Sequence, residues 1–181
     1  MLTVACVLSQ IENKGYNLFH VERLRQQVAL HLQQPYQFIC LQDSPFPGWW
    51  AKISLFEPKR FEGRVLYFDL DITIVGKLDE VADYPAVFAA SRDALNPGIN
   101  SSVMLWTAGQ QDHIYNGFTE ADMAKNPFGD QQWIQRVAIP SKFPVAWFPS
   151  YKLTLNKDFN NLKPDAKAII FHGQPKSWDL K

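Results

Sequence analysis

The 181-residue sequence has no excess of charge of either sign, because eighteen Lys and Arg residues balance eighteen Asp and Glu residues. A protein that binds nucleic acid or an anionic membrane over a broad surface usually carries a basic excess that neutralises phosphates. The sequence therefore argues against a polyanionic partner, and we expect no nucleic-acid partner.

Long hydrophobic runs are also missing. No window approaches the roughly 18 consecutive apolar residues that cross a membrane as a helix. The first ten residues, MLTVACVLSQ, lack the positive charge and the long apolar segment of a secretory signal. We therefore expect no transmembrane segment and a location in the cytoplasm.

Cysteine is scarce, since the chain has only Cys6 and Cys40. Both fall within apolar segments typical of interior strands, where a reduced thiol behaves as a small hydrophobic side chain. This favours a reducing compartment. Aromatic residues, by contrast, are plentiful: thirteen Phe, six Tyr and six Trp can fill a core or line a carbohydrate site, and composition alone does not separate these uses.

Three short segments are apolar and rich in β-forming residues, without the alternation of a half-exposed strand. They are residues 2–8, 36–41 and 64–69. Such segments suit a sheet that is covered on both faces. Between the first two, apolar residues recur at helical spacing over residues 17–34, and Asn17 is placed to cap the helix. The order strand, helix, strand predicts parallel pairing.

Further elements are expected around this unit. Residues 48–56 and 130–137 have the composition of short helices. Additional strands are expected at residues 86–90, 100–106, 145–148 and 167–171. The whole predicts a single α/β domain over residues 1–181, Rossmann-like, with a mostly parallel central sheet and flanking helices.

The most informative segment is the strand that runs into Asp69, Leu70 and Asp71 (RVLYFDLD). In an open α/β sheet, ligands bind beyond the carboxyl ends of the strands, so both carboxylates are expected to face a binding crevice. Two carboxylates within about 5 Å of each other raise each other's pKa, and a divalent cation relieves the repulsion. Hard oxygen ligands select Mg²⁺ or Mn²⁺. The alternative is an ordinary solvated pair at a strand end, since D-x-D is common by chance.

Several segments, in order along the chain, resemble the retaining glycosyltransferases of family 8, a group with the GT-A fold that includes galactosyltransferase-like and glycogenin-like enzymes. RVLYFDLDITIVGKLDEV resembles the metal-binding stretch of the family, and NPGINSSVMLW resembles its F-N-S-G-V-M-L motif. GDQ resembles its D-Q-D motif, and FHGQPKSW resembles its H-x-x-G-x-x-K-P-W end piece. GWWAKISLF resembles the helix that carries a donor-contacting basic residue. The resemblance extends over nearly the whole chain.

The resemblance implies a metal-dependent hexosyltransferase with a GT-A fold. In such enzymes two carboxylates and a histidine hold Mn²⁺, or Mg²⁺, against the donor diphosphate, which implies that Asp69, Asp71 and His172 are the metal ligands. Asp130 would hydrogen-bond the donor sugar. Gln131 would face the anomeric carbon. Because an amide is a poor nucleophile, it would position the donor or stabilise the oxocarbenium ion and would not attack the carbon. The residues implied in substrate binding are Ser9, Lys52, Leu70, Asn100, Ser102, Gly173 and Lys176.

The implied donor is a nucleotide diphosphate sugar, with UDP-hexose as the leading candidate, and the implied acceptor is a carbohydrate or another hydroxyl compound. The sequence also departs from the family pattern. His172 directly precedes Gly173 without intervening residues, and Ser177 stands where Pro is common. Gln132 replaces the third acid of D-Q-D, and Ser102 replaces the Gly of the sugar motif. These departures concern the sugar pocket.

Two other interpretations remain open at this point. YFDLDITIV also resembles the first motif of haloacid dehalogenase phosphohydrolases, in which Asp69 would be the nucleophile and Asp71 the general acid and base, with Mg²⁺ between them. That motif normally opens the core near the N-terminus, whereas here a strand, helix and strand precede it, and Ile72 stands at the usual Gly position. The second alternative is a non-catalytic nucleotide-sugar-binding protein descended from such an enzyme.

Overall fold

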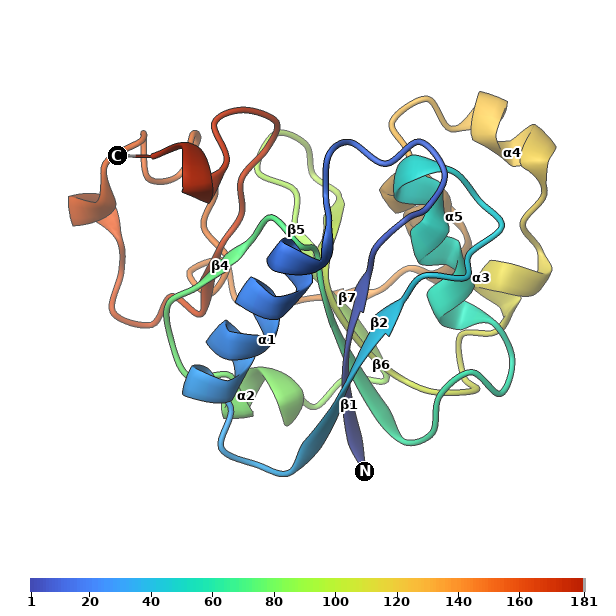
Figure 1. The fold of residues 1–181 in the computed structure, drawn as a ribbon, viewed down its shortest axis with the longest axis horizontal. Helices are drawn as coiled ribbons and strands as arrows, with labels where there is room; N and C mark the ends of the chain where they lie inside the picture. Colours follow the sequence, from blue (N-terminus) through green and yellow to red (C-terminus); the bar gives the residue numbers. More distant parts are fainter. Residues whose placement is uncertain (181) are drawn as a thin grey trace.

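The computed structural model describes residues 1–180. It contains a six-stranded sheet with the order β2-β1-β3-β6-β5-β7 and a two-stranded sheet of β4 and β8 (Figure 1). The strands are β1 (Leu2–Val7), β2 (Tyr36–Leu41), β3 (Arg64–Phe68), β4 (Thr73–Ile74), β5 (Phe88–Arg92), β6 (Ile99–Thr107), β7 (Ser141–Lys142) and β8 (Ala168–Ile169). The α-helices are α1 (Leu18–His31), α2 (Asp79–Ala82), α3 (His113–Asn116), α4 (Glu120–Lys125) and α5 (Asp130–Ala138). The 3₁₀ helices are η1 (Gly48–Phe56), η2 (Phe159–Asn161) and η3 (Ser177–Asp179).

The six-stranded sheet is mostly parallel. β1 pairs parallel with β2 and β3, and β5 pairs parallel with β7. β6 is antiparallel to both of its neighbours, β3 and β5. Because β1 and β3 run in the same direction, both strands end at the same edge of the sheet, where open α/β sheets bind ligands.

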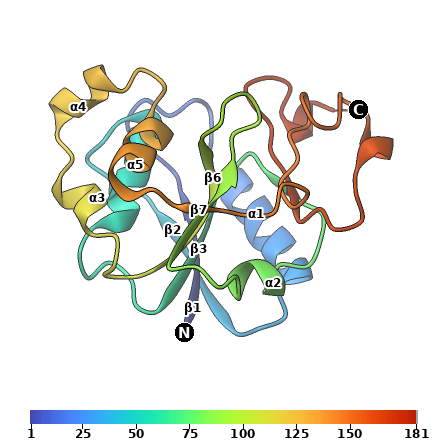
Figure 2. The ribbon, with the colours of Figure 1, turned by 180° about the vertical axis from the view of Figure 1, so that it is seen from behind.

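Helix α1 connects β1 to β2 and completes the predicted strand, helix, strand unit. Its first turn is capped as the sequence predicts: the Asn17 side chain accepts a hydrogen bond from the Phe19 amide at 3.0 Å, and the His20 ring accepts one from the Asn17 amide at 3.1 Å. α1 lies on one face of the sheet, whereas η1, α3 and α5 lie on the other (Figure 1, Figure 2). The sheet is therefore the middle layer of three.

Strand β3 shows why polar and apolar residues do not alternate along the apolar segments. Leu66 and Phe68 belong to the core cluster beneath α1, and Val65 and Tyr67 belong to the cluster beneath η1 and α5. Side chains alternate between the two faces of a strand, and here both faces are covered by helices. All four residues are buried, so the strand is apolar almost throughout.

Most of the predicted elements are present. Residues 36–41 coincide with β2, and the helix expected at 48–56 forms as the 3₁₀ helix η1. The strand expected at 86–90 begins two residues later, as β5. Among residues 1–180, no helix has the length and apolar character needed to cross a bilayer.

The strand predicted at residues 145–148 is wrong. These residues form a turn, and the edge strand of the sheet is β7, a few residues earlier. The apolar character of the segment has another cause, because Trp147 and Phe148 pack with Phe143 in an aromatic cluster at ring-centroid distances of 6.0 and 5.1 Å from Phe143. The aromatic side chains are needed for packing and not for strand pairing.

Candidate functional site

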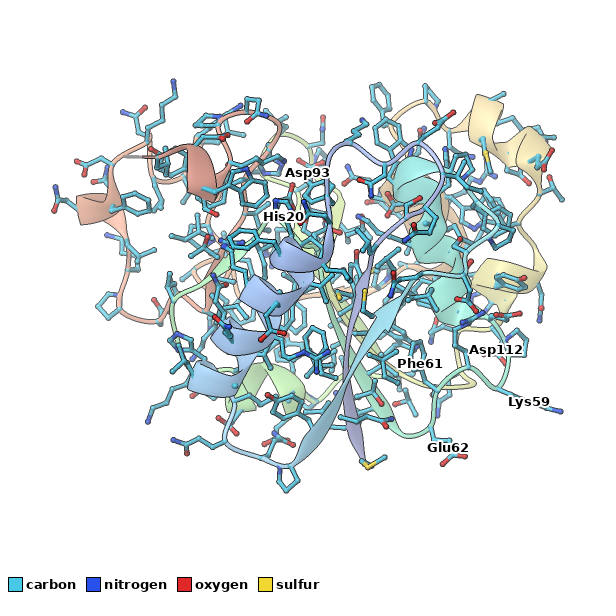
Figure 3. The ribbon with its side chains drawn as sticks, in the orientation of Figure 1. His20, Lys59, Phe61, Glu62, Asp93 and Asp112 are labelled. Carbon is cyan, nitrogen blue, oxygen red and sulfur yellow. The ribbon has the colours of Figure 1, made fainter. Side chains whose placement is uncertain are left out.

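A cavity of about 530 Å³ lies beyond the carboxyl ends of β1 and β3. The predicted site residues line this cavity, with the exception of Asn100. They are Ser9, Lys52, Asp69, Leu70, Asp71, Ser102, Asp130, Gln131, His172, Gly173 and Lys176. In Figure 3, His20 and Asp93 mark the side of the molecule on which these strands end, and Glu62, just before β3, marks the opposite side.

Lys52 lies at the centre of a charge cluster at the base of the cavity. Its Nζ atom is 3.0 Å from an oxygen of Asp69 and 3.4 Å from Oδ2 of Asp130, and it donates a hydrogen bond to the Ser101 hydroxyl at 3.0 Å. Burial alone would lower the pKa of Lys52, but the charges of Asp130 and Asp69 outweigh it and raise the pKa above its usual range. Lys52 is therefore a permanent cation, positioned by η1.

Asp130 is the least compensated member of this cluster. It is the first residue of α5 and only 4% exposed, and its Oδ2 atom accepts no hydrogen bond from residues 1–180, since the contact with Lys52 is an ion pair at 3.4 Å. Burial raises the pKa of Asp130, and Lys52 and Ser101 offset part of that rise. A buried acceptor left without a donor costs about 1–3 kcal/mol. The ion pair with Lys52 offsets part of this cost, and a ligand hydroxyl that reached this oxygen would supply the missing hydrogen bond.

Asp69 directly follows β3 and is held on two sides. Tyr67 donates its hydroxyl to Asp69 at 2.5 Å, and Lys52 donates to the same carboxylate. The Asp69 amide in turn donates to the Ser102 carbonyl at 2.9 Å. Burial, followed by the charge of Asp69, raises the pKa of Tyr67, so its hydroxyl keeps the proton that it donates.

Asp71 lines the same cavity and has a different set of partners. Its carboxylate accepts a hydrogen bond from the Tyr16 hydroxyl at 2.8 Å and forms an ion pair with Lys176. Burial and the charge of Asp71 raise the pKa of Tyr16, which stays protonated. Because Lys176 belongs to the segment after β8, this contact closes the C-terminal part of the chain over the strand ends.

His172 lines the same cavity. Burial is the largest cause of a lowered pKa, with a further contribution from Lys152 and Lys176, whereas Asp93 and Asp71 oppose the shift. The imidazole is therefore neutral at pH 7, which is the form that binds metal ions.

The predicted metal ligands share the cavity without being gathered around one point. Among residues 1–180, no three His, Cys, Asp or Glu side chains form a group that could hold an ion. Asp69 and Asp71 are paired instead with lysines. The donor set itself, two carboxylates and a neutral imidazole, has the chemistry that Mn²⁺ and Mg²⁺ accept. Binding of an ion would require Asp71 to exchange Lys176 for it.

Asn100 is placed just outside the cavity. Its side-chain oxygen accepts hydrogen bonds from the Ser102 amide at 2.9 Å and from the Ser91 hydroxyl at 3.4 Å. The neighbouring Ser101 reaches the cavity and contacts Lys52. Ser101 and Ser102 thus line the cavity, whereas the Asn100 side chain is used to hold the strand end. A role for Asn100 in donor binding stays a prediction.

The cavity is also lined by residues that the sequence did not predict. Among them are Lys14, Tyr16, Trp49, Tyr67 and Phe128. Two of them have a local signal. Tyr67 lies two positions before Asp69 and hence on the same face of the strand, and Trp49 lies one 3₁₀ turn before Lys52. The others reach the cavity from loops, where no periodicity predicts the direction of a side chain.

Comparison of the sequence with protein-family profiles and with curated proteins finds no match. Comparison with solved structures finds glycosyltransferases. The glycosyltransferase GlyE of Streptococcus pneumoniae TIGR4 superposes with a TM-score of 0.69 at 16% identity, over 98% of this chain and 57% of GlyE. The bifunctional WbbM has a TM-score of 0.69 at 14% identity, over 98% of this chain and 46% of WbbM. The galactosyltransferase LgtC, solved with donor and acceptor sugar analogues, has a TM-score of 0.62 at 14% identity, over 97% of this chain and 89% of LgtC.

This chain thus spans about half the length of GlyE and WbbM. At such low identity the likeness concerns the fold, and it extends over nearly the whole chain. The predicted GT-A arrangement, with a mostly parallel central sheet and flanking helices, is confirmed. The chain has the fold of these glycosyltransferases.

Proposed function

We propose that this chain transfers a hexose from a nucleotide diphosphate sugar, with UDP-hexose as the donor, to a hydroxyl group of an acceptor, with retention of configuration. The observation that carries the proposal is the charge cluster of Lys52, Asp69 and Asp130, which lines the cavity and contains a buried Asp130 oxygen that accepts no hydrogen bond from residues 1–180. The shared fold with glycosyltransferases supports it. Free cysteines, one buried and one partly buried, support a cytoplasmic location.

The leaving group of this reaction is a nucleoside diphosphate, which gains negative charge as the glycosidic bond breaks. Mn²⁺ or Mg²⁺ held by Asp69, Asp71 and His172 would neutralise part of that charge as a Lewis acid. Lys176 lines the same cavity and would supply a second positive charge to the phosphates. Gly173 adopts a φ of +63° and exposes its amide without a side chain, which lets a phosphate approach.

The donor sugar would lie against the charge cluster. The Oδ2 atom of Asp130 would accept a hydrogen bond from a sugar hydroxyl. Lys52 would hold Asp130 and Asp69 at a fixed separation. Gln131 donates from its amide to Asp93 at 3.3 Å, a contact that would orient it toward the reacting carbon. We place Ser9 and Leu70 beside the nucleoside, and Ser102 and Asn100 beside the sugar.

The donor is tested by thermal shift and calorimetry with UDP-glucose, UDP-galactose and other nucleotide sugars, each with and without Mn²⁺. We expect the midpoint of unfolding to rise with a donor and to rise further when Mn²⁺ is also present, because a ligand that binds only the folded state stabilises it. Mass spectrometry of the products then distinguishes transfer or donor hydrolysis from binding alone. A protein that binds no nucleotide sugar under any of these conditions would contradict the proposal.

The phosphohydrolase alternative requires Asp69 to act as a free nucleophile. In the structure its carboxylate is engaged by Tyr67 and Lys52, which reduces its ability to attack. The non-catalytic alternative predicts donor binding without any product, and the same mass-spectrometric assay decides between it and the transferase.

A further inference from the structure

Two exposed aromatic side chains line the cavity beside the charge cluster. Trp49 is 46% exposed and Phe128 is 78% exposed. Trp49 lies one 3₁₀ turn before Lys52, and Phe128 lies two residues before Asp130. Both residues come from the face of the sheet that carries η1 and α5, whereas Lys176 comes from the C-terminal segment on the other face (Figure 1).

The ring of Trp49 is held in position by its surroundings. The Nζ atom of Lys14 lies 4.3 Å from the ring centroid, within the range of a cation–π contact. The backbone of Gly129 packs against the same ring, so that a Cβ atom at this position would lie 3.0 Å from the indole nitrogen. Two separate segments therefore contact the indole, and Trp49 is still 46% exposed. A ring that stacks on the indole face covered by the Lys14 ammonium must displace it.

We propose that Trp49 and Phe128 form an acceptor platform, and that the acceptor is a carbohydrate with one pyranose ring packed on the indole of Trp49. This inference rests on the proposed function. The C–H groups on one face of a pyranose carry partial positive charge and pack favourably on the electron-rich face of an aromatic ring. The hydroxyl groups at the edge of the sugar would meet polar side chains that line the same cavity, namely Glu12, Lys14 and Gln131.

The position of the platform distinguishes a sugar from other occupants. A nucleobase belongs at the nucleoside end of the donor, whereas Trp49 and Phe128 immediately flank Lys52 and Asp130, the residues proposed to hold the donor sugar. An acyl chain would need a continuous apolar groove, whereas charged Glu12 and Lys14 lie in the same wall of the cavity. A rigid aromatic surface with polar groups at its edge fits a sugar ring, because it offers contact area at a small entropic cost.

The experiment follows the indole N–H signal of Trp49 in ¹⁵N-labelled protein, assigned with the Trp49→Phe variant. The probes are lactose, maltose, cellobiose and N-acetylglucosamine, added at millimolar concentration to protein saturated with UDP and Mn²⁺. We expect at least one probe to shift the Trp49 signal. Trp49→Ala and Phe128→Ala should each lower the affinity for that probe about tenfold, while the affinity for UDP changes less than twofold.

The matched control is Phe19→Ala, which removes a 67%-exposed aromatic side chain that does not line the cavity. This variant should change neither affinity. Equal losses of UDP and probe affinity in Trp49→Ala would overturn the platform and assign the indole to the nucleobase. Failure of every probe to shift the signal while UDP binds would also overturn it. A sugar that shifts the signal of a protein to which no nucleotide binds would support the platform and contradict the proposed function.

Discussion

The cavity contains two lysine–aspartate pairs that are built in different ways. Lys52 and Asp69 come from η1 and the end of β3, both of which pack in the core beneath the sheet. Lys176 and Asp71 join the C-terminal segment to the turn after β3. The first pair is fixed by the core, whereas the second depends on how a terminal segment docks.

The end of this segment docks in part on α1, and Phe171 at its start packs on Tyr151. Arg23 donates to the Ser177 hydroxyl at 2.5 Å, and the Trp178 ring lies edge-on to His20 at a centroid distance of 4.5 Å. Residues 171–179 take no part in strand pairing. One side of the cavity is therefore preformed, and the other can exchange partners at a smaller free-energy cost.

Lys52→Met should abolish donor binding and lower the free energy of unfolding by about 3 kcal/mol, because it leaves two largely buried carboxylates without their cation. Urea denaturation and calorimetry with UDP-hexose measure the two effects. Lys125→Met is the control, since the Lys125 side chain is 64% exposed and Asp122 keeps its contact with Arg136, and it should leave the denaturation midpoint unchanged. A stable Lys52→Met protein that binds donor normally would show that the interior pair is not needed.

Lys176→Ala should have effects of opposite sign on two ligands. Removing the lysine frees Asp71 from its ion pair, so the affinity for Mn²⁺ alone should rise several-fold. The affinity for UDP with Mn²⁺ should fall about tenfold, because one phosphate-binding charge is lost. Calorimetric titrations with Mn²⁺ alone and with UDP and Mn²⁺ measure both changes. The urea midpoint should fall less than in Lys52→Met, because one carboxylate loses its cation instead of two and Asp71 keeps its hydrogen bond from Tyr16. Weaker binding of Mn²⁺ alone would contradict the proposed exchange at Asp71.

Asp130→Asn should weaken nucleotide-sugar binding more than UDP binding and should change the pH dependence of stability. Burial raises the pKa of Asp130 in the folded protein above its unfolded value of about 3.9. A raised pKa means that the stabilising contribution is complete below the unfolded pKa and is lost as the pH rises through the folded pKa. Urea denaturation between pH 3 and pH 7 should therefore show a smaller loss with rising pH in the variant, and an unchanged slope would contradict this assignment.

Protonation of His20, which packs against Trp178 in the C-terminal segment, should have the smallest of these effects. Burial lowers the pKa of His20 below its usual range. The neutral ring accepts a hydrogen bond from the Asn17 amide and packs against Trp178. The contribution of neutral His20 to the stability of the folded protein is present above the pKa that His20 has in the unfolded chain. It is lost as the pH falls through the pKa that His20 has in the folded protein. Acidification should therefore change the tryptophan fluorescence, and Trp178→Phe should remove that change while the fold is retained.

The sequence predicts the surroundings of the Lys52–Asp69 pair better than those of the Lys176–Asp71 pair. The strand that carries Asp69 and the cap at Asn17 follow from local patterns, because burial and capping depend on neighbouring residues. The pairing of Lys176 with Asp71 joins residues 105 positions apart, and no local pattern contains that contact. Family resemblance, and not periodicity, placed His172 and Lys176 in the site.

The sequence also fails where one position decides the outcome. Ser101 and not Asn100 reaches Lys52, because the Asn100 side chain is engaged by the Ser102 amide and the Ser91 hydroxyl. The reversed direction of β6 was likewise not predictable, because an apolar strand pairs equally well in either direction. Trp147 and Phe148 resemble a strand but complete an aromatic cluster.

Gly129 has a consequence for engineering this protein. Its φ of +89° and its contact with the indole of Trp49 leave no room for a side chain, so any replacement would tilt the indole or displace the start of α5. Displacing that helix moves Asp130 as well. Substitution of Trp49 should therefore change the preference for the acceptor alone. Substitution of Gly129 should disturb both the acceptor and the donor sugar, because Gly129 contacts Trp49 and precedes Asp130.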